Sequence, residues 1–402
     1  MSLVAQAAGY VGNYSSYLPN AAGTIAHSRT TSYGDNSKST SISSSYGLSL
    51  GMTLYDFGQR EFRIETAEQA FLAAGQTYNA TLQSTISNAL QGYYALLNAQ
   101  NALTVAKQSE KFAKESYDAA LLRHKIGQVA LADELQGKNT YSQALLSTES
   151  VENALVLQQA ALAQIMGFSP DVPIQVADID DKTLAKDPFG GRVQGLMEEA
   201  KAKRHDLQAS RYSLKSSEAS YEALKRSDLA TVSVTTNLGV TNDNAHIFNY
   251  NSARSQGIGL NVSIPIFTGF SQTYSEHSAE ESLKAQRESM ITTERNVEAS
   301  VWNAWHNYET SKTSWKTSQD QIASAILLKD VALGQYKEGL NSILDVLNAQ
   351  LQYSAALQSQ LQTRYNLLTT RVALVQSVGV LDLVSMNPEA VLDTTAGTGL
   401  KQ

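Results

Sequence analysis

The chain has 402 residues, of which 17% are charged, and its net charge is −7. An average soluble domain has about 25% charged residues. The acidic balance excludes nucleic acid as an expected partner, because nucleic-acid-binding surfaces are basic. No apolar run reaches the roughly 18 residues that a membrane-spanning helix needs. Cysteine is absent, which excludes disulfides, thiolate metal ligands and a cysteine nucleophile.

The N-terminus lacks the basic segment and the long apolar core of a secretion signal. We therefore expect the chain to begin as a mature fragment behind Met1-Ser2-Leu3, and this absence gives no information about its compartment.

Four segments contain no Asp, Glu, Lys or Arg, at residues 1–28, 39–55, 229–242 and 255–273. In the last three, apolar residues alternate with polar ones, and residues 16–27 alternate more weakly. The alternating apolar sets are Leu48, Leu50, Met52 and Leu54; Val232, Val234, Leu238 and Val240; and Leu260, Val262, Ile264 and Ile266. Period two predicts strands with one apolar and one polar face. Polar loops at about 29–45 and 241–254 would join these strands into two β-hairpins.

Long helices are expected between the strands, because proline is missing from two long stretches. It is absent for 150 residues after Pro19 and for 122 residues after Pro265, and proline inside a helix costs about 3 kcal/mol. Residues 59–123 are rich in helix formers and would make a rod of roughly 100 Å. Heptad spacing predicts a coiled-coil seam. Its members are Leu82, Ala89, Leu96 and Leu103, and then Leu347, Ser354, Leu361, Leu368 and Val375.

The two halves of the chain align at an offset of 212 residues. Gly47 then matches Gly259, Gly127 matches Gly339, and Asp133 matches Asp345. The repeated unit is a hairpin, a long helix, a glycine turn and a shorter helix. We predict a first repeat at 1–190, a second at 191–380 and a tail at 381–402. A helix at about 192–225 precedes the second hairpin, and its counterpart before the first is expected to be missing through truncation.

Four strands per chain cannot close a membrane barrel, which needs at least about eight, and an open sheet exposes its edges. Oligomerisation would solve both problems, since two chains supply eight strands and three supply twelve. A soluble sandwich with its apolar face inside fits the same pattern. The missing charges and the attached helices favour the barrel.

The segments 123–135 (the first tip) and 335–349 (the second tip) resemble the tip motif of TolC-type outer-membrane efflux proteins. Residues 54–58 and 264–269 resemble the strand-to-helix junctions of that family, and residues 17–19 resemble the start of its first strand. The resemblance covers nearly the whole chain. It implies a mainly α fold with β, in which duplicated helical hairpins form a tunnel. Four strands per chain would contribute to a trimeric, twelve-stranded outer-membrane barrel.

The resemblance also implies a function and partners. A homotrimer in outer-membrane lipid would extend into the periplasm as a passive exit duct for efflux or type I secretion. A periplasmic adaptor protein would join it to an inner-membrane pump or transporter. The cargo would be selected largely by the pump, so this chain does not identify it.

By resemblance, five residues belong to the tunnel entrance: Asp345, Asn348, Asp133, Tyr336 and Asn341. Asp345 would form an acidic ring, weakened because the family's second ring aspartate is Asn348 here. Tyr336 and Asp133 match two members of the family's closing network. The third member, an arginine, is replaced by Asn341. Independently of the resemblance, both aspartates suit a helix start, where a carboxylate is favourable.

Four residues are expected to contact the adaptor: Lys125, Gly127, Gly339 and Leu340. Glycine ends helices readily, so a plain helical hairpin is the simpler interpretation of both glycine turns, and contact with an adaptor is the functional one.

No catalytic constellation is present. The six histidines have no metal-site spacing, and His306 is interpreted as part of an aromatic packing belt with Trp302, Trp305 and Tyr308. The acidic group at 178–181 lacks the glycine and distal glutamate of a calcium loop. We therefore expect no enzyme, no metal and no cofactor. The alternative function is a soluble or adhesive coiled-coil protein with a β-head.

Overall fold

A computed structural model describes residues 2–34, 37–179, 189, 192–246, 249–338 and 340–381. The chain divides into two compact units, the first comprising residues 1–78 and 205–294 and the second residues 79–204 and 295–402. Each unit takes residues from both halves of the sequence. The predicted division at 1–190, 191–380 and 381–402 follows the repeat instead, and it stays a prediction. No helix in the described ranges combines the length and apolar character needed to cross a bilayer.

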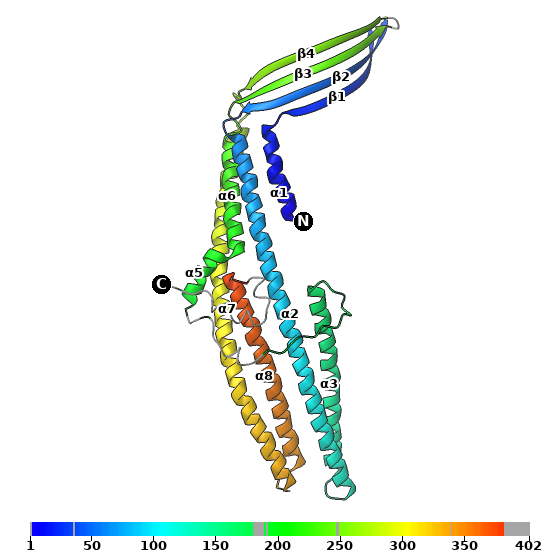
Figure 1. Cartoon of the computed structure of the whole chain (residues 1–402), viewed down its shortest axis with the longest axis vertical. Coiled ribbons are helices and arrows are strands. Elements are labelled where there is room, and N and C mark those ends of the chain that lie inside the picture. Colours follow the sequence, from blue (N-terminus) through cyan, green and yellow to red (C-terminus); the bar gives the residue numbers. More distant parts are fainter. Residues whose placement is uncertain are drawn as a thin grey trace. The chain divides into compact units, whose positions relative to one another are not determined.

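The same elements occur twice in the same order (Figure 1). The first set is β1 (Asn20–Gly34), β2 (Ser37–Tyr55), α2 (Gln59–Lys125) and α3 (Leu131–Ile165). The second set is β3 (Thr231–His246), β4 (Asn249–Ser263), α7 (Ser271–Lys337) and α8 (Ile343–Val378). Helices α2 and α7 have 67 residues each and start 212 residues apart. The predicted helix at 59–123 and the predicted order of elements are therefore confirmed.

In the first unit, the four strands form one antiparallel sheet in the order β1-β2-β3-β4, and they bend together (Figure 1). The loops predicted at 29–45 and 241–254 are wrong, because most of these residues continue the strands. Backbone hydrogen bonds extend the ladder wherever residues stay extended, whereas the alternation of apolar residues marks only part of each strand. Strands β1 and β4 are the two edges of the described sheet.

The register separates the two faces of the sheet. Leu48 lies opposite Leu238 and Met52 opposite Val234 on the apolar face, whereas Ser49 lies opposite Asn237 on the polar face. The apolar face is open in the single chain, since Leu48 is 51% exposed. It extends over about ten residues of β2, or roughly 30 Å at ~3.3 Å per residue. With the usual tilt, that length matches the ~25 Å apolar band of outer-membrane barrels.

Two strand boundaries differ from the predictions. β4 ends at Ser263, so Ile264 and Ile266 lie outside the sheet. Pro265 lies two residues after the end of β4 and has no N–H for the ladder. β1 begins at Asn20, and Tyr14–Tyr17 before it forms a 3-10 helix, η1.

The helix predicted to be missing before the first hairpin is present in part, as α1 (Ser2–Asn13). At the offset of 212 it corresponds to the last 12 residues of α6 (His205–Lys225). The single helix predicted at 192–225 is instead two, α5 (Val193–Lys203) and α6. Arg204 between them is extended, with ψ 118°. Its guanidinium donates to the Ser377 carbonyl at 3.1 Å, which connects the break to the last turn of α8.

In the second unit, α2, α7 and α8 enclose an aromatic and aliphatic core. The predicted seam contributes Leu368 and Val375 to this core. Leu96 and Leu347 of the seam are also buried. Its remaining apolar members, Leu82, Ala89, Leu103 and Leu361, are half-buried. Tyr94, Trp305, Tyr308 and Trp315 complete the core. Of the predicted aromatic belt, Trp305 and Tyr308 are buried, whereas Trp302 and His306 are exposed and contact each other at the surface with their rings 4.5 Å apart.

Candidate functional site

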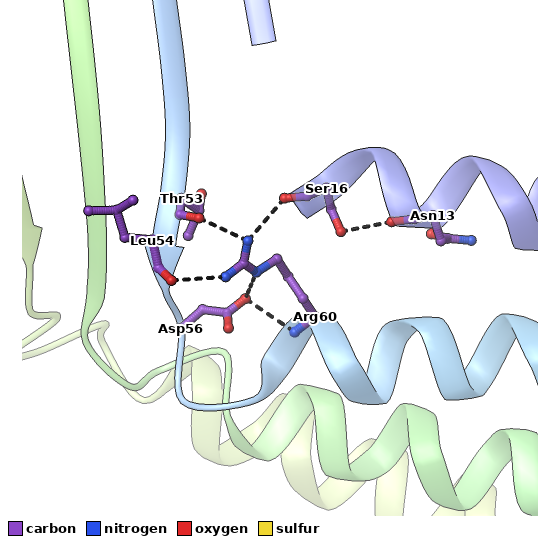
Figure 2. Close-up of polar contacts among 6 residues, drawn as sticks. All are labelled: Asn13, Ser16, Thr53, Leu54, Asp56 and Arg60. Carbon is purple, nitrogen blue, oxygen red and sulfur yellow. Dashed lines mark hydrogen bonds and ion pairs between the residues drawn. The ribbon is translucent and has the colours of Figure 1, made fainter. Parts of the chain in front are cut away.

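The junction between β2 and α2 is organised by Arg60, in the first turn of α2 (Figure 2). Its Nε donates to Asp56 Oδ2 at 2.9 Å, and its guanidinium also donates to the carbonyls of Thr53 (2.9 Å), Ser16 (3.1 Å) and Leu54 (3.3 Å). The guanidinium stacks on the Tyr17 ring at 4.5 Å. Arg60 therefore connects η1, the end of β2 and the start of α2.

The Asp56–Arg60 pair is almost completely buried, with side chains 9% and 11% exposed. Burying charges is tolerated when they are paired and their hydrogen bonds are satisfied, as they are here. The chain can reach this arrangement because Phe57 and Gly58 both take positive φ, 54° and 85°. The sequence resemblance identified this junction but not Arg60, although the i,i+4 spacing of Asp56 and Arg60 was a usable signal.

The second junction uses neutral groups at the corresponding positions. Thr268 and Gln272 stand where the first repeat has Asp56 and Arg60. Gln272 Nε2 donates to the Leu224 carbonyl at 2.8 Å, and its Oε1 accepts from Ser227 Oγ at 3.1 Å. The two strand-to-helix junctions therefore share a fold, but the first has a charged pair where the second has neutral side chains.

A hollow of about 740 Å³ lies where the polar face of the sheet meets the first junction. Its lining includes Ser49, Thr53, Ser233, Thr235 and Asn237 from the polar face, with Asp56, Arg60 and Arg63 from the junction and α2. A hollow with this lining can hold water and polar solutes.

The first tip is a tight reversal between α2 and α3. Gly127 has φ 73°. Its N–H donates to the His124 carbonyl at 2.9 Å, and the Gln128 N–H donates to the Arg123 carbonyl at the same distance. This is the glycine-ended helix that the sequence predicted. Lys125 is exposed and ends α2. In the second tip Leu340 is 76% exposed, while Gly339 lies outside the described residues.

Asp345 caps helix α8 together with Ser342. The Asp345 carboxylate accepts from the Ser342 hydroxyl at 2.7 Å and from the Ser342 N–H at 3.0 Å, while Ser342 Oγ accepts from the Asp345 N–H at 3.4 Å. The hydroxyl bond first, and then the backbone bond, lower the pKa of Asp345 below its ordinary 3.8. The cap is thus complete at neutral pH, and its contribution to stability is lost as the pH falls through the lowered pKa.

Within the described residues of the single chain, the members of the predicted closing network do not bond to one another. The buried hydroxyl of Tyr336 has no hydrogen-bond partner among the described residues, so no bond to Asp133 is made. Asn341 donates to Gln335 Oε1 at 2.6 Å. Instead, the Arg123 guanidinium lies over the Tyr336 ring at 4.4 Å, linking the last turns of α2 and α7. Sequence reasoning missed Arg123, which the first tip carries two residues before Lys125.

The other predicted entrance residues lie at helix starts. Asn348 is exposed one turn after Asp345 on α8, and Asp133 is half-buried in the first turn of α3. Helix α3 has no side-chain cap, since Ala130 stands at its N-cap. The capping interpretation of the aspartates therefore holds for Asp345, whereas Asp133 caps nothing.

Comparison with known proteins gives one consistent result. The sequence profile of the family described as outer membrane efflux protein matches residues 4–168 and 196–380. Protein CyaE of Bordetella pertussis is 24% identical over 378 residues, covering 91% of this chain and 77% of CyaE. Outer membrane protein TolC of Escherichia coli is 23% identical over 374 residues, covering 88% of this chain and 73% of TolC. The solved outer-membrane channel OprN superposes with a TM-score of 0.80 at 20% identity, covering 94% of this chain and 85% of OprN.

Proposed function

Because this chain belongs to the outer membrane efflux protein family, and so is an outer-membrane efflux channel and not an enzyme, we propose that it works as a homotrimeric exit duct. Three chains would form a twelve-stranded barrel in outer-membrane lipid. The duct would serve a tripartite efflux or type I secretion system, in which a periplasmic adaptor connects it to an inner-membrane pump. Transport through the duct is passive, and the cargo is selected largely by the pump.

The observation that carries this proposal is the open sheet. Four strands with an exposed apolar face and two free edges are unstable in water by themselves. Pairing β4 of one chain with β1 of the next would satisfy both edges, and the apolar band would then face lipid. The polar face and its hollow would line the lumen, as in other outer-membrane barrels. A soluble β-head would have to cover the same apolar face with protein.

We propose that the second tip forms the tunnel entrance, with Asp345 as an acidic ring and Asn348 adding only dipoles. Three-fold assembly would bring three Asp345 carboxylates around one axis, which favours cations between them. Tyr336 would contribute to closure through the Arg123 guanidinium stacked on its ring, in place of the arginine that Asn341 replaces. Asp133 would be available to a neighbouring chain.

We propose that the adaptor binds at the tips, through Lys125 and Gly127 of the first and Gly339 and Leu340 of the second. The exposure of Lys125 and Leu340 supports this assignment, as does the 61% exposure of Ile126. Exposed apolar residues at a turn are suited to protein contact.

The proposal is tested in planar bilayers with the purified protein in detergent. Discrete conductance steps are expected from the wild-type chain. The variant Asp345→Ala should lose cation selectivity and block by multivalent cations, because it removes the proposed ring. The matched variant Ser342→Ala weakens the same helix cap but keeps the charge, so it should retain both properties.

The two variants separate the two roles of Asp345. Equal loss of selectivity in both would assign Asp345 to the cap alone. Unchanged selectivity in Asp345→Ala would contradict the proposed ring, and a wild-type protein that never gives conductance steps would contradict the duct itself.

A further inference from the structure

We infer that Arg63 is an anion-binding residue of the duct, and that it favours cargo bearing carboxylate or phosphate groups. The inference rests on the proposed function, because the polar face of the sheet becomes the wall of a lumen only in an assembled barrel. Arg63 lies one turn after Arg60 on α2 and lines the hollow on the polar face.

The net charge of the residues that line this hollow is the charge of one side chain. Its charged lining residues are Asp56, Arg60 and Arg63. Asp56 and Arg60 neutralise each other at 2.9 Å, and the guanidinium of Arg60 is further occupied by three backbone carbonyls. The remaining positive charge is that of Arg63, whose side chain is exposed.

No carboxylate is placed to neutralise Arg63 along its own helix. Residues three and four positions away are the neighbours on a helix surface, and for Arg63 these are Gln59, Arg60, Thr66 and Ala67. Glu61 and Glu65 are two positions away and point elsewhere.

The hollows that Arg63 lines also contain no unpaired carboxylate among their described lining residues. Arg63 also lines an adjoining hollow of about 430 Å³ between the end of α1, the start of α2 and the end of α6, whose other lining residues are all uncharged. Among the described residues that line the two hollows, Asp56 is the one acid, and it is already paired.

The chemistry of the site follows from the guanidinium. Its planar fork matches carboxylate and phosphate oxygens in a bidentate way. The second repeat has Ser275 at the position corresponding to Arg63, so each chain supplies one such charge and a trimer supplies three. Charges of one sign around a confined aqueous space concentrate the opposite ion by about tenfold or more.

The test uses the assembled protein in planar bilayers, with inorganic tripolyphosphate as the probe. Arg63→Gln should raise the half-blocking concentration of tripolyphosphate by roughly tenfold or more and shift the reversal potential toward cations, opposite in sign to Asp345→Ala. Arg63→Lys keeps the charge and should keep most of the block. The difference should shrink at about 1 M salt, where the Debye length is ~3 Å.

A second measurement does not depend on conductance. Calorimetric titration of the detergent-solubilised protein with tripolyphosphate should detect binding to the wild-type chain and to Arg63→Lys, but not to Arg63→Gln. Binding without any conductance would contradict the proposed duct while supporting the anion site. Equal block and equal reversal potential in Arg63→Gln and wild type, or no tripolyphosphate binding by the wild type, would overturn the inference.

Discussion

At the scale of single residues, two arginines one turn apart on α2 have opposite roles. Arg60 is buried and bonded to a carboxylate and three carbonyls, whereas Arg63 is exposed. The first is a structural residue of the junction, and the second is available to solutes. Residue type alone does not distinguish them, since both are arginines on one face of one helix.

Replacing Arg60 by Gln should destabilise the first unit by about 3 kcal/mol or more, because it leaves the Asp56 carboxylate buried without its partner. The measurement is the temperature at which the detergent-solubilised protein loses its sheet by circular dichroism. Arg63→Gln is the matched control and should unfold like the wild type.

The double variant Asp56→Asn with Arg60→Gln tests whether the unpaired Asp56 carboxylate causes the loss of stability. It removes both charges and should recover part of the lost stability. A single Arg60→Gln variant as stable as the wild type would show that the buried pair does not stabilise the junction.

The left-handed turn at Gly127 leads to a second prediction at this scale. A Cβ added at Gly127 would meet no atom within 4 Å, so the cost of a substitution comes from its φ of 73°. Gly127→Val should cost about 1–3 kcal/mol, distort the first tip and impair export. Gly127→Asn should be milder, because asparagine tolerates this conformation.

Export of a pump substrate from cells, with the amount of barrel in the outer membrane as control, measures the effect. Normal export by Gly127→Val at normal barrel levels would argue against adaptor contact at the first tip.

At the scale of elements, the last turns of α2 and α7 are joined by the Arg123–Tyr336 stack. A cation over an aromatic ring contributes about 0.5–2 kcal/mol, depending on its exposure. Because the Tyr336 hydroxyl has no hydrogen-bond partner among the described residues, the ring rather than the hydroxyl makes this link.

We therefore expect Tyr336→Ala and Arg123→Gln to raise the mean conductance of the duct in bilayers, since both loosen the contact between the helical hairpins. Tyr336→Phe keeps the ring and should behave like the wild type. If Tyr336→Phe opened the duct as strongly as Tyr336→Ala, a hydroxyl contact with another chain would be the closing interaction instead.

At the scale of the whole molecule, the open sheet requires other copies of the chain. Leu260 and Asn261 are adjacent on β4 but lie on opposite faces, opposite Val234 and Ser233. Leu260→Lys places a charge on the proposed lipid face, at a cost of about 2–4 kcal/mol near the bilayer midplane, and should prevent insertion. Asn261→Lys places the same charge on the lumen side and should be tolerated.

Native mass measurement in detergent should give a trimer for the wild type and for Asn261→Lys, and less of it for Leu260→Lys. A stable monomer with its β-structure intact would contradict the assembly.

The sequence by itself determined the architecture, because the signals for it are local and repeated. The alternation of apolar residues predicted the part of each strand that carries the apolar face. The missing prolines predicted the long helices, and the offset of 212 residues predicted that the elements repeat. The glycine of the first tip predicted the reversal of the chain there. The same signals fail where side chains are polar but the backbone still pairs, so the outer parts of the strands were predicted as loops. Local patterns also gave no sign of the break at Arg204.

Only the tertiary structure decided which charged side chains are paired within the chain and which remain accessible to solutes. Arg60, Arg63 and Arg123 look alike in the sequence, but one is buried against Asp56, one lines a hollow without a carboxylate partner and one lies on Tyr336. Asp345 and Asp133 match each other in the repeat, yet Ser342 makes a cap partner for the first, while Ala130 cannot do so for the second. The environments of Arg63 and Arg123 depend on groups brought together from distant parts of the chain, which spacing along the sequence does not encode, whereas the Asp56–Arg60 and Ser342–Asp345 spacings are local signals.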